Sequence, residues 1–151
     1  MRFRFRLDPV LQHRERVERE RAGDHARMLA AQLAAEAARD DLIGRRDGAR
    51  DRLIREHATL DVVELRATYV HLDYLDRAIV GAQQKVATAK VDTEQARLKL
   101  VDAARDRQVL DTLKERRREA FALEENRVEQ RELDDLNARL FERTAPEGTA
   151  S

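Results

Sequence analysis

The chain contains no cysteine and no tryptophan, only two prolines and five glycines, and aromatic residues make up 4% of its 151 positions. Without cysteine, neither a disulfide framework nor a catalytic thiol is possible. Hydrophobic residues reach 42%, but 23 alanines inflate that share, so large apolar side chains are too few for a thick globular core. Scarce helix breakers and abundant Ala, Leu, Arg, Glu and Gln favour long helices instead.

An excess of charge of one sign is also missing. Charged residues make up 40% of the chain, yet 30 Lys and Arg balance 30 Asp and Glu, which argues against a generic polyanion binder. No apolar run approaches the roughly 20 residues that cross a bilayer. The opening Met1-Arg2-Phe3-Arg4-Phe5-Arg6 lacks the apolar region of a secretion signal. We therefore expect a cytoplasmic protein.

Two helix-start signals divide the chain. Asp8 and Pro9 suit the first turn of a helix, because Asp8 can accept from free backbone donors and proline needs no partner for its nitrogen. Asp61 and Glu64 have the spacing of a capping box, and Leu60 and Leu65 have that of a hydrophobic staple.

These signals predict one domain over residues 1–151, formed by a single coiled-coil hairpin. Its parts are helix one at about 8–58, a turn at about 59–61, helix two at about 61–143 and a disordered tail at 144–151. Neither Gly nor Pro ends helix one, so a single continuous rod is the alternative. Glycines at 23, 44 and 48 each weaken helix one by roughly 1 kcal/mol relative to alanine.

Helix two contains a heptad pattern. One series, spaced by seven, is Leu72, Ile79, Val86, Thr93, Leu100 and Arg107; its companion, offset by three, is Leu75, Ala82, Ala89, Ala96, Ala103 and Leu110. Such a sustained a/d seam, with large residues beside small ones, predicts a coiled coil. It does not specify a function, because many unrelated proteins use coiled coils.

The two predicted helices differ in length. At 1.5 Å per residue they measure about 75 Å and about 125 Å. A chain folded back at Leu60 places Val10 near Leu113 and Val17 near Asp106. Helix two beyond about Ala120 then has no partner helix from its own chain, and the N-terminal segment can cover only a few more residues.

No catalytic constellation is found. The sequence lacks a phosphate-binding Gly-rich loop, a GxSxG elbow and an HExxH pair. Four histidines are scattered along the chain, and only His57 and His71 are expected near the same turn. Two ligands do not make a typical metal site, so we expect neither a metal nor a cofactor, and no enzyme activity.

The stretch from Leu113 to Leu136 has a basic beginning that suggests nucleic acid. Phosphate affinity requires a positive face, but Glu115, Glu119 and later carboxylates interleave with its arginines, and no aromatic ladder accompanies them. A solvated face or a protein-binding surface fits this pattern better than a nucleic-acid site.

Three sets of residues resemble the flagellar type III export protein family FliJ over nearly the whole chain. They are Phe3-Arg4-Phe5-Arg6-Leu7-Asp8-Pro9-Val10-Leu11, the stretch from Tyr69 to Gln84, and the blocks Val109 to Arg116, Glu125 to Gln130 and Leu133 to Leu136. The resemblance implies an antiparallel two-helix coiled coil similar to that of the gamma subunit of rotary ATPases.

The same resemblance implies a function and partners. Family members insert into the pore of the hexameric export ATPase FliI and promote its assembly and activity. They also contact the export-gate protein FlhA at the cytoplasmic face of the inner membrane and have been described as escorts for export chaperones. A chain of this kind is a non-enzymatic stalk and coupling component.

The resemblance also assigns candidate sites by position. Candidates for gate binding are Leu42, His71, Leu75, Ala78 and Ala82. Candidates for ATPase binding, together with the N-terminal segment, are Arg116, Arg117, Arg127, Glu129, Gln130, Asp134 and Asp135. Because Leu75 and Ala82 also belong to the heptad seam, a purely structural role is an equal interpretation for them.

Two other hypotheses stay open. A long helix with an unpartnered end could pair with another copy, which makes a homodimeric coiled-coil spacer the alternative function. The equivalent stalk of a virulence secretion system would have a closely similar sequence.

Overall fold

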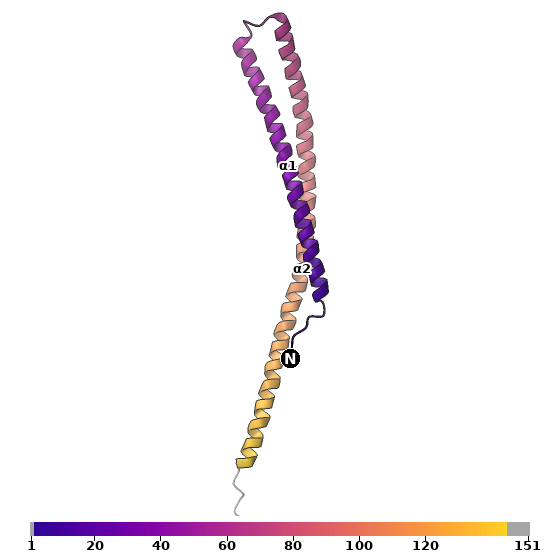
Figure 1. Ribbon diagram of the computed structural model, residues 1–151, viewed down its shortest axis with the longest axis vertical. Helices are drawn as coiled ribbons and strands as arrows, with labels where there is room; N and C mark the ends of the chain where they lie inside the picture. The colour runs from indigo at the N-terminus through magenta and orange to yellow at the C-terminus, as the bar shows by residue number, and fades with distance from the viewer. Residues whose placement is uncertain (1, 145–151) are drawn as a thin grey trace, which may run out of the picture. The chain divides into compact units, whose positions relative to one another are not determined.

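The structure is a computed structural model that describes residues 2–144, and the side chains of residues 2–141. Within this range the chain forms two helices and no strand: α1 spans Asp8–Glu56 and α2 spans Val62–Thr144. They pack as an antiparallel coiled-coil hairpin whose second helix is the longer (Figure 1), so the predicted fold class is confirmed. Apart from Thr144, the last residue of α2, the predicted tail at 144–151 lies outside the described residues.

The chain divides into two compact units, and each contains parts of both helices. The hairpin unit is Glu15–Ala104, and the terminal unit combines Met1–Arg14 with Arg105–Ser151. The single domain over residues 1–151 stays a prediction.

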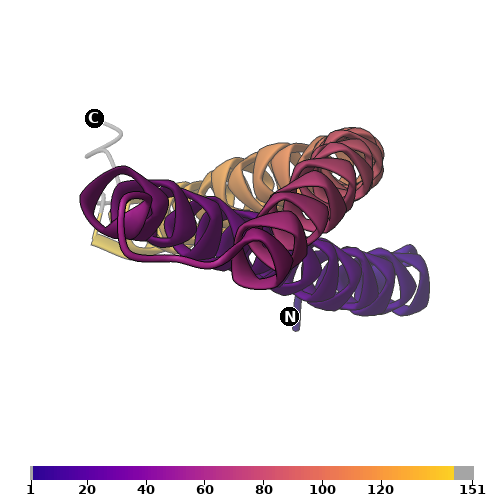
Figure 2. The same ribbon diagram turned by 90° about the horizontal axis from the view of Figure 1, so that it is seen from above.

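A short segment, residues 57–61, joins the two helix ends in the hairpin unit (Figure 2). Thr59 ends α1 in place of the missing glycine or proline, since its amide and hydroxyl donate to the Glu56 carbonyl at 2.9 and 2.8 Å. The predicted capping box then starts α2: the Glu64 amide donates to Asp61 Oδ1 at 2.8 Å, and the Asp61 amide donates to Glu64 Oε2 at 3.1 Å. These opposing signals exclude the continuous rod.

The beginning of α1 differs from the prediction in one respect. Asp8 is the first helical residue, but its carboxylate accepts from Lys114 Nζ at 2.6 Å and from Gln12 Nε2 at 3.4 Å rather than from the backbone. An ammonium group from the facing helix is a stronger partner than a neutral amide. Asp8 therefore links the helices instead of capping one of them.

The heptad face of α2 forms the core of the hairpin unit. The buried side chains, with their exposed fractions, are Leu72 8%, Leu75 2%, Ile79 4%, Val86 4%, Ala96 9% and Ala103 8%. Burial of a large aliphatic side chain contributes roughly 1.5–3 kcal/mol. All of these residues belong to the two predicted series, so the seam is confirmed.

The side of α1 that packs on this seam is largely polar, and it was not predicted from the sequence. Its half-buried positions also repeat every seven residues, at Glu18, His25, Gln32, Arg39 and Arg46. Long polar side chains can cover apolar surface with their stems while their charged ends stay in water. The polar sequence of α1 is thus compatible with close packing on α2.

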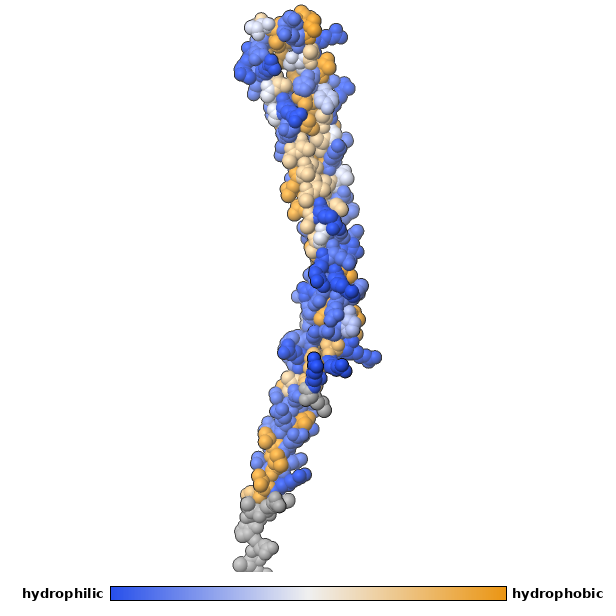
Figure 3. All heavy atoms as spheres, viewed as in Figure 1, coloured by the Kyte–Doolittle hydropathy of each residue, from blue (hydrophilic) through white to orange (hydrophobic). Residues whose placement is uncertain are grey.

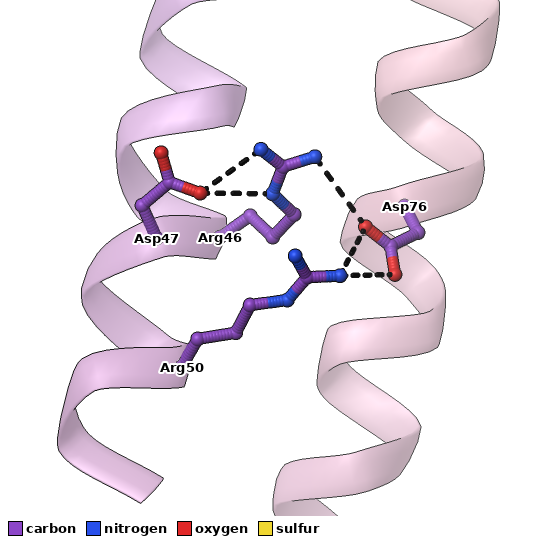
Figure 4. Close-up of polar contacts among 4 residues, drawn as sticks. All are labelled: Arg46, Asp47, Arg50 and Asp76. Carbon is purple, nitrogen blue, oxygen red and sulfur yellow. Dashed lines mark hydrogen bonds and ion pairs between the residues drawn. The ribbon is translucent and has the colours of Figure 1, made fainter. Parts of the chain in front are cut away.

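Ion pairs connect the helices in the hairpin unit. Arg46 Nη1 lies 3.8 Å and Arg50 Nη2 lies 3.3 Å from the Asp76 carboxylate (Figure 4). Lys90 Nζ lies 3.9 Å from Glu36. Each pair has at least one exposed partner, and surface pairs contribute at most about 1 kcal/mol each, so they favour the register more than they add stability.

Leu75 and Leu98 provide a test of the seam. Leu75 is only 2% exposed, so Leu75→Ala leaves a cavity in the core. We expect it to lower the free energy of unfolding by about 2–4 kcal/mol. Leu98→Ala removes the same atoms from a residue 50% exposed and should cost well under half as much. Urea unfolding followed by circular dichroism measures both; equal losses would contradict the assignment of Leu75 to the core.

Candidate functional site

An open apolar patch lies on the face of α2 next to the turn. Its residues, here called the tip surface, are Val63, Arg66, Ala67, Val70, His71 and Tyr74. Val63 is 76% exposed, and Val70 and Tyr74 are each 64% exposed. Residues at i, i+4, i+7 and i+11 share one face of a helix. The tip surface is therefore an apolar stripe distinct from the seam, which suits a partner with an apolar groove.

The tip surface has a defined aromatic arrangement. The His71 and Tyr74 rings are stacked, with centroids 6.4 Å apart and planes inclined by 19°. Arg66 makes no ion pair with any described residue, so the apolar stripe is bordered by a basic group that is open to a partner.

The predicted gate-binding residues fall on two different faces. Exposed His71 and half-buried Ala78 lie on the side of the tip surface. Leu75, Ala82 and Leu42 are instead seam residues: Leu75 is buried, and the other two are half-buried. Val63 and Val70 were not among the predicted residues, although their helical spacing with Tyr74 was an available signal.

A cleft of about 560 Å³ lies where the two helices meet the turn, and its lining includes Glu56, Glu64 and His71. His57 Nδ1 lies 3.0 Å from the Ile54 carbonyl oxygen. Within residues 2–141, no group of three His, Asp or Glu side chains is arranged to hold a metal ion. The cleft is therefore the space between the two helix ends beside the turn.

The clear pKa shifts belong to exposed ion pairs between neighbouring residues on one helix. The hydrogen bonds from Arg97 lower the pKa of the Glu94 carboxyl, while Glu94 raises the pKa of Arg97. Glu56 likewise raises the pKa of Arg52 through a side-chain hydrogen bond. Each shift favours the ionised form, which suits an ion pair rather than a proton donor at neutral pH.

In the terminal unit, the N-terminal segment packs on α2. The Phe3 and Phe121 rings lie 5.7 Å apart at a tilt of 52°, and Phe5 is buried at 8% exposed. Lys114 Nζ lies 6.0 Å from the centroid of the Phe5 ring. These contacts agree with the predicted cover of a few residues by the N-terminal segment.

The expected register is also found in this unit. Arg14 Nη1 pairs with Asp106 Oδ2 at 3.0 Å, and Asp8 pairs with Lys114 at 2.6 Å. The next seam positions of α2 after Phe121 are Glu124, Val128, Arg131 and Asp135, all exposed. The seam thus becomes polar where α1 and the N-terminal segment no longer cover α2.

The uncovered part of α2 nevertheless carries apolar residues. Leu123, Leu133 and Leu136 are 59%, 60% and 55% exposed. Hydrophobic and hydrophilic surface alternates along the end of α2 (Figure 3). The predicted ATPase-binding residues Arg116, Arg117, Arg127, Glu129, Gln130, Asp134 and Asp135 are all exposed as well. Of these, Arg127 pairs with Glu124 at 3.6 Å.

These features define an all-α coiled-coil protein with exposed apolar and charged surfaces at the turn and at the end of α2. The chain belongs to the flagellar FliJ family: the sequence pattern described as "Flagellar FliJ protein" matches residues 3–145. Members of that family are non-catalytic components of the flagellar type III export apparatus. No curated protein and no solved structure matched the chain. Neither helix, over the described residues, has an apolar stretch long enough to cross a bilayer.

Phe121 provides a test of the terminal unit. We expect Phe121→Ala to release the N-terminal segment, because Phe3 loses its ring contact. Trypsin should then cleave after Arg4 and Arg6 several times faster, while the hairpin melts at nearly the same temperature. Leu123→Ala, at a residue 59% exposed, is the matched control; unchanged cleavage in Phe121→Ala would show that the ring contact does not hold the segment.

Proposed function

We propose that this protein is the central stalk and coupling component of a flagellar export ATPase complex. Its terminal unit binds the pore of a hexameric, FliI-like ATPase and promotes ring assembly and ATP hydrolysis. Its tip surface binds an FlhA-like export gate, at the cytoplasmic face of the inner membrane. Export chaperones are further candidate partners.

The observation that carries the proposal is the exposed end of α2 beyond Phe121. This segment is helical without a partner helix, and it presents charges of both signs beside exposed leucines. A pore lined by polar loops matches such a surface, since charged contacts favour orientation and rapid encounter. The coiled-coil seam supplies the stiffness that a stalk requires.

The division of the gate-binding candidates between two faces favours one of them as the contact. A residue 2% exposed, such as Leu75, has almost no surface for a partner. Gate binding through His71 and Ala78, extended by Val70 and Tyr74, leaves the seam intact. Leu42, Leu75 and Ala82 then act by holding the helices together.

A homodimeric spacer is the second candidate, favoured by exposed Leu133 and Leu136. Sedimentation equilibrium separates the two functions, because a pore-binding stalk is a monomer when free and a spacer is a stable dimer. The equivalent stalk of a virulence secretion system has the same physical properties; flagellar genes beside this gene would favour the flagellar assignment.

ATP hydrolysis by the cognate ATPase tests the proposal. We expect the protein to stimulate hydrolysis, and we expect Arg116→Glu with Arg127→Glu to abolish ring association while helicity is retained. Lys85→Glu with Lys99→Glu makes the same charge change in the hairpin unit and should have little effect. If the wild-type chain neither stimulates nor associates with an ATPase that forms hexamers, the proposed function is wrong.

Binding to the cognate export-gate protein tests the tip surface. We expect Val70→Asp to weaken binding by about tenfold or more, because it puts a charge at the centre of an apolar contact. Val91→Asp is the matched control: Val91 is 55% exposed and stands three heptads further along the same column of α2. Equal losses by calorimetry would mean that the contact is not confined to the tip.

A further inference from the structure

Charge is segregated along the terminal unit, although the whole chain is neutral. Residues 2–14 and 105–121 contain ten Lys and Arg against five Asp and Glu. Residues 122–141 contain three arginines against six Asp and Glu. The balanced composition therefore conceals a basic band followed by an acidic band.

The basic band combines the N-terminal segment with α2. Its members are Arg2, Arg4, Arg6, Arg116, Arg117 and Arg118. All six are exposed, and none makes an ion pair with a described residue. The Phe3–Phe121 contact, with ring centroids 5.7 Å apart, brings the N-terminal segment to the part of α2 that follows Arg118.

The acidic band lies on the uncovered end of α2. Its members are Glu129, Glu132, Asp134 and Asp135, which are exposed and make no ion pair with a described residue. Leu133 and Leu136 stand among them at 60% and 55% exposed. An apolar stripe with carboxylates around it suits a surface that supplies basic groups around apolar ones.

The distance between the bands lets each act separately. Arg117 and Glu132 are fifteen residues apart on one helix, or about 22 Å. The Debye length at physiological ionic strength is about 8 Å. Carboxylates of the acidic band therefore cancel little of the field of the basic band, while Glu115 and Glu119 reduce that field from within and leave more basic than acidic groups there.

We propose that the ring that binds this end presents two bands of its own, with carboxylates facing the arginines and basic residues facing the acidic band. This inference rests on the proposed function and specifies the partner's chemistry. If the helix moved along the pore by the length of one band, a charged band of the helix would face ring residues of the same sign. The two bands therefore set the depth of insertion and exclude the reversed orientation.

A second copy of this chain can match the charges of the bands but not their leucines. Antiparallel pairing of two α2 ends about residue 125 would place Arg116 against Asp134 and Arg118 against Glu132. The same pairing would place Leu133 against Arg117 and Leu136 against Lys114, which leaves the apolar groups without apolar partners. A nucleic acid or an anionic lipid surface would use the basic band and be repelled by the acidic one.

Charge reversal of each band, measured as association with the assembled cognate ATPase, tests the proposal. We expect Arg116→Glu, Arg117→Glu, Arg118→Glu and, separately, Glu132→Lys, Asp134→Lys, Asp135→Lys each to weaken association by about tenfold or more. Raised salt should weaken wild-type association. Arg16→Glu, Lys85→Glu, Lys99→Glu is the control in the hairpin unit and should bind as the wild type does.

The outcomes separate the two claims. Wild-type failure to associate overturns the proposed function itself. Wild-type association that is unchanged or tighter in the acidic-band variant overturns only the two-band inference, because a generic polyanion surface would bind a more basic chain better. Suppose that sedimentation finds a wild-type dimer that neither charge-reversal variant forms, while both variants bind the ring as the wild type does. In that case the bands serve self-association and the inference is wrong.

Discussion

The packing of the α2 heptad face on α1 is the interaction on which the rest of the structure depends. Leu72, Leu75, Ile79 and Val86 supply the largest buried aliphatic side chains of the hairpin unit, and further along the seam the buried positions are alanines. A hairpin of two helices has no other place to bury apolar surface. Its polar contacts are exposed, so they select the register that the seam stabilises.

Because α2 is longer than α1, one part of α2 is covered by α1 and another part is not. Where α1 is present, α2 uses its seam internally and keeps other faces, such as the tip surface, for partners. Beyond Phe121 the same helix continues without α1, and its seam positions become polar. The function proposed for the terminal unit is thus a consequence of where α1 begins, at Asp8.

Much of the fold was predictable because the strongest patterns are local. The capping box at Asp61 and the heptads of α2 depend on residues a few positions apart. The seam side of α1 was not predictable in the same way, because half-buried residues such as Arg46 look polar in sequence, although the aliphatic stem of an arginine can cover apolar surface. The end of α1 depends on Thr59, which is a weaker signal than glycine.

The candidate sites were less predictable, because they depend on which way a helix faces. Leu75 and His71 are four residues apart, yet one is buried in the seam and the other is exposed. Partner identity likewise depends on chemistry that the partner supplies.

Photocross-linking to the assembled ATPase ring is the most direct measurement of the central claim, that the uncovered end of α2 is the surface that binds the ring. A photoreactive amino acid replaces Leu133 in one sample and Val63 in another. The account predicts cross-links to the ring from position 133 and none from position 63. Cross-links from position 63 without any from position 133 would contradict it.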